Sequence, residues 1–293
     1  MSRIVLSSFN EQPVVVTGAT GALGTALLEQ LNAPISQCSP DDIRTCNWDS
    51  ILPSHAIVFH LAACVHQPRA SWMHHLQVNA SATLRLGTKC LARSCKLVHA
   101  STIAAATPER SPYAASKALA EEMLAGLACE GLDVTNLRFP LLYGRLGRGN
   151  MERLMRAVGY GNYIPVGSPS ARKTCLHFRD AALALLFAAR ADYRGRTLGV
   201  PGTTHSLKEI TSLAYASWGK KAPSFWIPTQ LSRLSAALLD SVAPGSSAGR
   251  SLRSLLRSEE VVPGTPDVLP FEAAISLSDG LAEVARGLAS TSP

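Results

Sequence analysis

Short apolar segments alternate with longer helical patterns along the first half of the chain. The β-branched run Val14–Val16 leads into a glycine-rich turn and then into a helical pattern over 25–31. Further strands are predicted at 56–63, 96–102 and 133–140, with helices at 73–93 and 114–130 between them. Strands that alternate with helices form parallel sheets with helices on both faces. The pattern therefore predicts an α/β fold built on a doubly wound parallel sheet.

The pattern changes after Pro140. Residues 144–169 are rich in Gly, Arg and Pro and are predicted to be loops. Shorter helical patterns follow at 180–190, 206–218, 230–242 and 249–258. We expect a first domain over 1–145, to which 173–200 returns, and a smaller, mostly helical region over 146–293.

Composition and charge narrow the class of protein. The chain is 46% hydrophobic and carries 28 Lys and Arg against 21 Asp and Glu, a net charge of +7. This apolar content at modest charge density excludes a disordered chain. The basic residues between 138 and 173 lack the interleaved aromatic side chains of a nucleic-acid platform. We therefore expect a small anionic ligand and no nucleic acid.

Neither export nor membrane insertion is expected. The longest apolar run, 181–189, is too short to cross a bilayer, and the first ten residues lack the basic-then-apolar layout of a secretory signal. The amphipathic, basic stretch 230–257 is interpreted as a domain helix rather than a membrane contact. These features predict a cytoplasmic protein.

The cysteines and histidines do not indicate a metal site. The seven cysteines are scattered, without a C-x-x-C pair, and are interpreted as reduced thiols. Cys64, His66, His74 and His75 have the side chains of zinc ligands, but the adjacent His74 and His75 point to different faces of a helix. His60 ends a predicted buried strand and is interpreted as a hydrogen-bonded core or cofactor-side residue. We expect no metal.

Three glycines follow the first predicted strand at a spacing of three residues. Gly18, Gly21 and Gly24 remove Cβ atoms where the chain turns sharply, where a pyrophosphate approaches the backbone and where helix packs on strand. The following helix offers free N–H groups to phosphate oxygens. A strand, glycine turn and helix in this order predict a dinucleotide site within the first domain.

A tyrosine and a lysine stand four positions apart at the start of the second long helix. Tyr113 and Lys117 therefore share one helix face. A free tyrosine is too weak an acid–base at neutral pH, and a nearby ammonium lowers its pKa. Thr102, at the end of the strand 96–102, supplies a second hydroxyl. Taken alone, the pair also fits an exposed helix face, so the surrounding motifs decide between the two interpretations.

Those motifs together are specific. They are Thr-Gly-x-x-Gly-x-x-Gly at 17–24, Asp42-Ile43-Arg44, His60-Leu61-Ala62-Ala63, Asn79, Ser101-Thr102, Tyr113-x-x-x-Lys117, Leu137-Arg138-Phe139 through Tyr143-Gly144, and His177-x-x-Asp180. In this order, the chain resembles the extended short-chain dehydrogenases/reductases, the NAD-dependent epimerase/dehydratase family, over about residues 13–215. The resemblance implies a Rossmann domain and a C-terminal substrate-binding region.

The resemblance also implies roles for individual residues. Thr102, Tyr113 and Lys117 would be the catalytic hydroxyl, the acid–base and the cation that lowers its pKa. NAD or NADP would contact Gly18, Thr20, Gly21, Ala22, Leu23, Gly24, Asp42, Ile43, Leu61, Ala62, Ala63, Asn79, Tyr113, Lys117 and Pro140. The substrate would contact Thr102, Tyr113, Leu141, Arg172 and Lys173. The match is closest to the branch of 4-keto-sugar reductases and 4-epimerases.

We therefore expect NAD(P)H-dependent reduction of a keto group, at C4 of a nucleotide-linked deoxy sugar. A nucleotide-sugar 4-epimerase is the first alternative, and a non-catalytic dinucleotide-sensing protein on the same fold is the second. A sensor has no need of an acid–base pair, which Tyr113 and Lys117 would supply. The candidate assembly for this chain is a homodimer.

Three departures from the family pattern bear on this expectation. Only nine residues separate Leu31 from Asp41, so the second strand is predicted to be vestigial, without the acidic residue that binds the adenosine ribose. The choice between NAD and NADP therefore stays open. Thr102 and Tyr113 are only eleven positions apart, which shortens a loop over the substrate. Leu141 stands where many nucleotide-sugar enzymes carry Asn.

Overall fold

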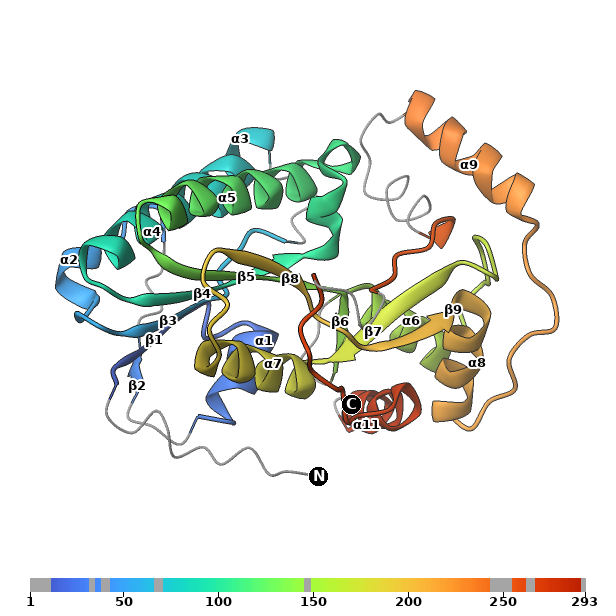
Figure 1. Cartoon of the computed structure of the whole chain (residues 1–293). Helices are drawn as coiled ribbons and strands as arrows, with labels where there is room; N and C mark the ends of the chain where they lie inside the picture. The colour runs from blue at the N-terminus through green and yellow to red at the C-terminus, as the bar shows by residue number, and fades with distance from the viewer. Residues whose placement is uncertain are drawn as a thin grey trace. The chain divides into compact units, whose positions relative to one another are not determined.

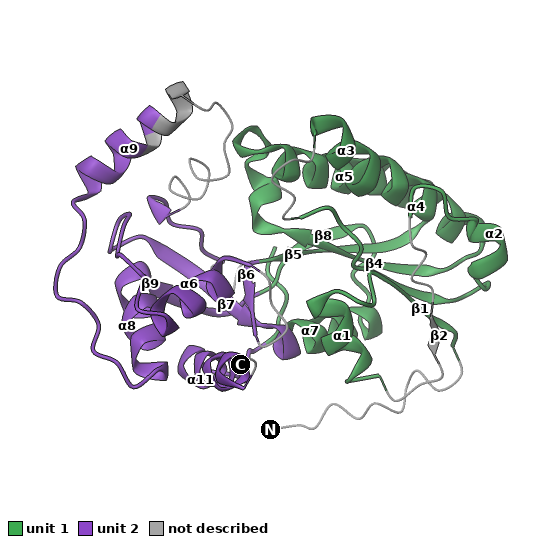
Figure 2. Cartoon of the chain, turned by 180° about the vertical axis from the view of Figure 1, so that it is seen from behind, with its two compact units in different colours: residues 1–139, 181–200, 264–271 green, residues 140–180, 201–263, 272–293 purple. Residues whose placement is uncertain are grey.

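The computed structural model describes residues 12–31, 35–37, 43–65, 71–144, 149–242, 255–261 and 267–290. Asp42 and most of the helix predicted at 249–258 lie outside these residues. The chain forms two compact units (Figure 2). The first comprises 1–139, 181–200 and 264–271, and the second comprises 140–180, 201–263 and 272–293. The first boundary therefore falls at Phe139 rather than at 145.

The first unit is built on a six-stranded parallel sheet in the order β2-β1-β3-β4-β5-β8 (Figure 1). The strands are β1 (Val14–Thr17), β2 (Ile35–Gln37), β3 (Ile57–His60), β4 (Lys96–Thr102), β5 (Asp133–Phe139) and β8 (Arg196–Gly199). The second strand has only three residues, as its short predicted segment implies.

Helices cover both faces of this sheet, which confirms the doubly wound fold. One face carries α4 (Ala82–Ala92) and α5 (Pro112–Cys129), and the other carries α1 (Ala22–Leu28) and α7 (Phe178–Arg190) (Figure 1). The predicted helix 73–93 is divided into α3 (Trp72–Leu76), a π-helical turn η2 (Gln77–Ser81) and α4. Two short 3₁₀ turns, η3 (Ile103–Ala106) and η4 (Pro108–Arg110), connect β4 to α5.

Apolar burial holds the first unit together. Val14–Val16 are fully buried because helices cover both faces of their strand, so the strand is continuously apolar rather than alternating. Leu86 of α4 and Leu124 of α5 join the same core as Leu97 of β4. Each such leucine contributes about 1.5–3 kcal/mol of transfer free energy. The core thereby fixes the strand ends that carry the predicted site residues.

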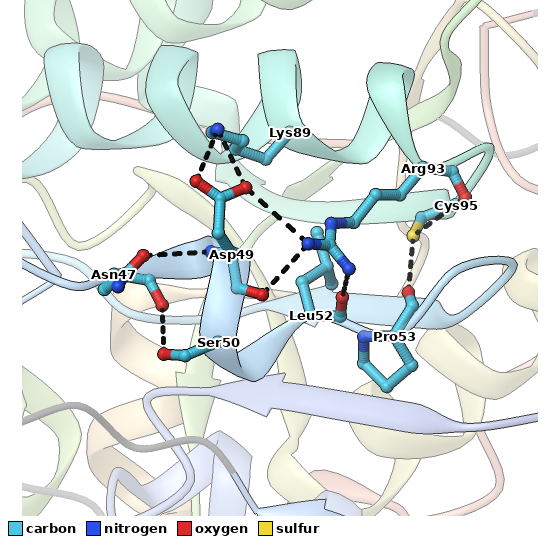
Figure 3. Close-up of polar contacts among 8 residues, drawn as sticks. All are labelled: Asn47, Asp49, Ser50, Leu52, Pro53, Lys89, Arg93 and Cys95. Atoms are coloured by element: carbon cyan, nitrogen blue, oxygen red, sulfur yellow. Dashed lines mark hydrogen bonds and ion pairs between the residues drawn. The ribbon is translucent and has the colours of Figure 1, made fainter.

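A short helix is tied to α4 by charged side chains (Figure 3). Asp49 of α2 (Trp48–Ile51) accepts hydrogen bonds from Lys89 Nζ at 2.9 and 2.8 Å. Arg93 donates to the carbonyls of Leu52 and Asp49 at 2.6 and 2.9 Å. Asn47 caps α2 by accepting from the Asp49 N–H at 3.2 Å. These contacts anchor the segment that follows Ile43, one of the predicted cofactor residues.

The second unit contains a three-stranded mixed sheet beside its helices. Strand β7 (Arg172–His177) pairs parallel with β6 (Leu141–Tyr143) and antiparallel with β9 (Thr203–Ser206). The helices described are α6 (Asn150–Gly159), α8 (Leu207–Ser217), α9 (Thr229–Val242) and α11 (Leu277–Ala289). Tyr143, Met155 and Leu281 belong to its core.

The prediction of loops over 144–169 was wrong, because α6 lies within that stretch. Its buried residues Met151, Met155 and Val158 follow a helical period that the surrounding Gly and Arg residues obscured. Among the residues that the structure describes, no helix combines the length and apolarity needed to cross a membrane.

Candidate functional site

The glycine turn between β1 and α1 is too tight for side chains. Gly18 has φ of 71°, and a Cβ there would lie 2.7 Å from the Ala62 nitrogen. A Cβ at Gly24 would lie 2.3 Å from the Gly18 carbonyl oxygen, which also accepts the Gly21 N–H at 3.0 Å. Glycines are thus required by the approach of backbone to backbone.

The turn lies against the loop after β3, and together they are the candidate cradle for dinucleotide phosphates. The Ala62 N–H donates to Thr17 Oγ1 at 3.3 Å, which ties the Leu61–Ala63 loop to the end of β1. The N-cap of α1, Gly21, has no side chain to occupy the N–H groups of the first helical turn. No side chain therefore caps the start of α1, which is the arrangement that a phosphate site at this helix end requires.

Asn79 is fully buried within the π-helical turn and braces the predicted active-site elements. Its Oδ1 accepts the Cys64 N–H at 2.7 Å, and its Nδ2 donates to the Cys64 carbonyl at 3.1 Å and to Ser116 Oγ at 3.0 Å. Ser116 Oγ in turn donates to the Tyr113 carbonyl at 2.9 Å. Asn79 thus links the loop after β3 to the first turn of α5. The π-turn itself has no signal in the sequence period.

Thr102 and Tyr113 are brought together. Thr102 ends β4, and Ser111 caps α5 so that Tyr113 falls in its first turn. Partial burial raises the pKa of the Tyr113 phenol to about 12, and a hydrogen bond with the Thr102 side chain opposes this shift. The hydroxyl pair expected from the sequence is therefore present.

Lys117 is fully buried, and its amine contacts His99, which the sequence pattern does not predict as a site residue. Burial lowers the pKa of Lys117 to about 7, against the opposing effect of the Glu121 carboxylate. Lys117 Nζ lies 2.8 Å from His99 Nε2. His99 sits three residues before Thr102 on β4, so only the three-dimensional structure shows that it faces α5.

His60 is a satisfied buried residue, as its position predicted. Its Nδ1 lies 2.7 Å from Thr17 Oγ1 and its Nε2 lies 2.8 Å from Thr83 Oγ1. Desolvation lowers the pKa of His60 to about 3, and the Lys117 charge adds to this effect. Burial likewise places the pKa of His99 well below its ordinary value.

These buried histidines predict acid sensitivity of folding. Between pH 6.5 and pH 3 the unfolded chain binds a proton at His60 that the folded chain does not bind, so the free energy of unfolding falls as the pH falls through this window. Urea denaturation at pH 7 and pH 5 measures the loss. His60→Gln removes one of the titrating groups, so its stability should depend less steeply on pH. An equal pH dependence in His60→Gln and the parent protein would contradict the assignment.

The remaining predicted residues lie in the second unit. Pro140 precedes β6, and Leu141 is its first residue. Arg172 is half exposed and pairs with Glu260 at 3.1 Å, whereas Lys173 is buried and pairs with Glu259 at 2.9 Å. A substrate phosphate would therefore compete with a carboxylate at either cation. The exposed, planar guanidinium of Arg172 is the better candidate of the two.

Comparison with known proteins gives the family. The family model described as "NAD dependent epimerase/dehydratase family" matches residues 14–200, which is more than half of the chain. The chain belongs to this family, and it is an NAD(P)-dependent enzyme of the extended short-chain dehydrogenase/reductase type. None of the curated protein sequences compared with the chain matches it significantly.

Solved structures share the fold. MoeE5 in complex with UDP-glucose and NAD is 24% identical, with a TM-score of 0.73 over 96% of this chain and 99% of that chain. UDP-N-acetylglucosamine 4-epimerase from Methanobrevibacter ruminantium M1 is 20% identical, with a TM-score of 0.75 over 97% and 100%. UDP-glucuronic acid 4-epimerase from Bacillus cereus, in complex with NAD, is 16% identical, with a TM-score of 0.74 over 95% and 99%.

Proposed function

We propose that the enzyme reduces a keto group at C4 of a nucleotide-linked sugar, with Tyr113 as the proton donor. The observation that carries the proposal is the placement of the Tyr113 hydroxyl against Thr102, on the helix that also carries the buried Lys117. The neighbours in complex with UDP-glucose and with UDP-N-acetylmuramic acid support a nucleotide-sugar substrate.

The chain's own residues supply proton transfer and orientation. Bound NAD(P)H would supply the hydride. Thr102 and Tyr113 hydrogen-bond the substrate oxygen, and the Tyr113 hydroxyl delivers the proton to it. A phenol with a pKa near 12 holds its proton tightly, so a protonated Lys117 assists by stabilising the phenolate that remains. The glycine turn and the Leu61–Ala63 loop hold the cofactor.

The need to exchange the cofactor favours reduction over epimerisation. A reductase consumes one cofactor per turnover and must release it, whereas an epimerase returns the hydride to the same substrate and can keep its NAD. The three-residue β2 leaves little chain to anchor the adenosine ribose, and each tenfold loss of affinity corresponds to about 1.4 kcal/mol. The short connection through η3 and η4 also leaves less chain to cover the substrate.

A 4-epimerase is the second candidate, because two of the structural neighbours described above are named as 4-epimerases. Cofactor retention separates the two functions. We expect the purified enzyme to carry little NAD(P), as measured by absorbance of the extract after denaturation, and to oxidise added NAD(P)H in equal amount to a nucleotide 4-keto sugar. Tightly held NAD, with interconversion of C4 epimers and no added cofactor, would instead establish the epimerase.

We further propose that Arg172 binds a substrate phosphate. Arg172→Gln should raise KM for the nucleotide sugar about tenfold with little change in kcat, because a phosphate contact acts equally on bound substrate and transition state. Steady-state kinetics measure the effect. The matched control is Arg179→Gln, which removes a second arginine of the same unit, also half exposed and paired with a glutamate, Glu283, at 3.2 Å. Equal KM values for the two variants would remove Arg172 from the substrate site.

A further inference from the structure

One register row of the parallel sheet carries polar side chains across five strands. Thr17 of β1 pairs with His60 of β3, His60 with His99 of β4, His99 with Asn136 of β5, and Asn136 with Thr197 of β8. Neighbours in one row of a parallel sheet project to the same face. The row therefore runs through the core of the first unit, along strands that Figure 1 shows side by side.

Hydrogen bonds within this polar row assign the proton positions on His99. Asn136 Nδ2 donates to Thr197 Oγ1 at 3.1 Å, so Asn136 presents its Oδ1 to His99 Nδ1 at 2.9 Å. An oxygen at that position accepts, which places the proton of neutral His99 on Nδ1. Nε2 then carries a lone pair, and Lys117 Nζ donates to it at 2.8 Å.

His60 holds His99 in place without competing for Lys117. Thr83 Oγ1 donates to the Asn79 carbonyl at 2.8 Å, so His60 Nε2–H donates to Thr83, and His60 Nδ1 accepts from Thr17 Oγ1. Both nitrogens of His60 are thereby occupied. Its ring stacks on that of His99, with centroids 5.6 Å apart and planes 24° apart. The ring of His99 is held by this stack and by Asn136.

We propose that His99 is a positioning residue for Lys117, with Nε2 accepting one N–H of the ammonium and directing the remaining two. The proposal rests on the proposed function, in which Lys117 assists Tyr113. The buried amine needs such an acceptor, since an ammonium without partners in the core loses its proton. Glu121 also favours the charged amine, but its carboxylate is engaged by Ser101 Oγ and by Arg138, at 2.6 Å for the latter.

The charged and titratable groups that act on Lys117 lie on three elements. Glu121 stands on α5, the helix of Lys117 itself, and its carboxylate favours the ammonium. His99 on β4 and His60 on β3 are buried histidines whose pKa is lowered by desolvation and then by the Lys117 charge, so both stay neutral in the folded enzyme. A change at His99 therefore removes an acceptor from the amine without removing a charge.

The test compares two amides at position 99. His99→Gln can place an oxygen near the former Nε2 position, whereas His99→Asn keeps a polar group beside Asn136 and is too short to reach Lys117. The ¹³Cε resonance of Lys117, labelled with [¹³Cε]lysine and assigned by its loss in Lys117→Met, reports the proton on the amine without any substrate. We expect the proton affinity of Lys117 to fall about tenfold in His99→Asn and to be restored in His99→Gln.

Turnover provides the second readout. Activity falls at alkaline pH when Lys117 loses its proton, and an amine of lower proton affinity loses it at a lower pH. The alkaline limb of the kcat profile should therefore move to lower pH in His99→Asn and return to its original position in His99→Gln. Thr135→Val removes a buried β5 hydroxyl that donates to the Tyr193 carbonyl at 3.1 Å and lies outside the polar row. It is the control for disturbed packing and should leave the limb in place. If His99→Asn does not fold, His99→Phe fills the ring volume without an acceptor.

An unchanged Lys117 titration in folded His99→Asn or His99→Phe would overturn the proposal. So would an equal effect of Thr135→Val, because the losses in the position-99 variants would then arise only from disturbed packing. A wrong proposed function would give another result from a wrong role for His99. The ¹³C titration of Lys117 would then respond as expected, while the parent enzyme would not turn over nucleotide 4-keto sugars.

Discussion

Tyr113→Phe is expected to lower turnover by about a hundredfold or more while cofactor binding stays nearly unchanged. The substitution deletes the hydroxyl that meets Thr102 and keeps the partly buried ring, so the loss falls on proton transfer. A loss confined to the transition state lowers kcat and kcat/KM together. Single-turnover oxidation of NAD(P)H, followed by absorbance, measures the chemical step, and fluorescence titration with NAD(P)H measures binding.

A second tyrosine offers a matched control. Tyr215→Phe removes a hydroxyl that donates to the Tyr163 carbonyl at 3.3 Å in the second unit. That loss should affect stability slightly and the chemical step little, because the net contribution of such a hydrogen bond is about 1 kcal/mol. Turnover of Tyr113→Phe at the level of Tyr215→Phe would exclude Tyr113 as the proton donor.

Gly24→Ala is expected to destabilise the first unit by about 3 kcal/mol and to abolish dinucleotide binding. The added Cβ would lie 2.3 Å from the Gly18 carbonyl oxygen and 2.7 Å from Ala19 Cα, and neither atom belongs to a flexible side chain. The backbone of the turn must therefore move, which displaces the N–H groups that would bind the pyrophosphate. Thermal unfolding with and without NAD(P)H measures both effects.

A glycine-to-alanine substitution at an open position in a helix should have the opposite effect on stability. Gly126 lies in α5, and a Cβ there would meet nothing within 4 Å. Gly126→Ala should therefore stabilise the protein by up to about 1 kcal/mol, because alanine is the better helix former. Similar losses in Gly24→Ala and Gly126→Ala would show that the effect at Gly24 does not arise from crowding at the turn.

Features encoded by local spacing could be predicted from the sequence. The glycine turn, the four-residue spacing of Tyr113 and Lys117, and the position of Thr102 at a strand end each depend on residues close together in the chain. The period of the first half likewise predicts the doubly wound sheet, because the strands predicted at 14–16, 56–63 and 96–102 are each followed by a helical pattern. The short second strand follows from the nine residues available before Asp41.

Features that depend on register between distant strands could not be predicted. His99 contacts Lys117 because β4 packs beneath α5 at one particular register, and the polar row joins five strands between 17 and 197. A linear pattern shows such residues only as isolated polar positions in apolar strands. The helix α6 was missed for a different reason, because glycine and arginine around it resemble loop composition.

Transfer of deuterium tests the central claim most directly. The enzyme is incubated with a nucleotide 4-keto sugar and with NADH or NADPH that carries deuterium at C4 of the nicotinamide ring. The two stereoisomers of each deuterated cofactor are used in separate reactions. We predict that one isomer yields product with a single deuterium at C4 of the sugar, seen by NMR and mass spectrometry, and that Tyr113→Phe suppresses this product. Oxidation of the cofactor without deuterium at C4, or turnover that needs no added cofactor, would contradict the account.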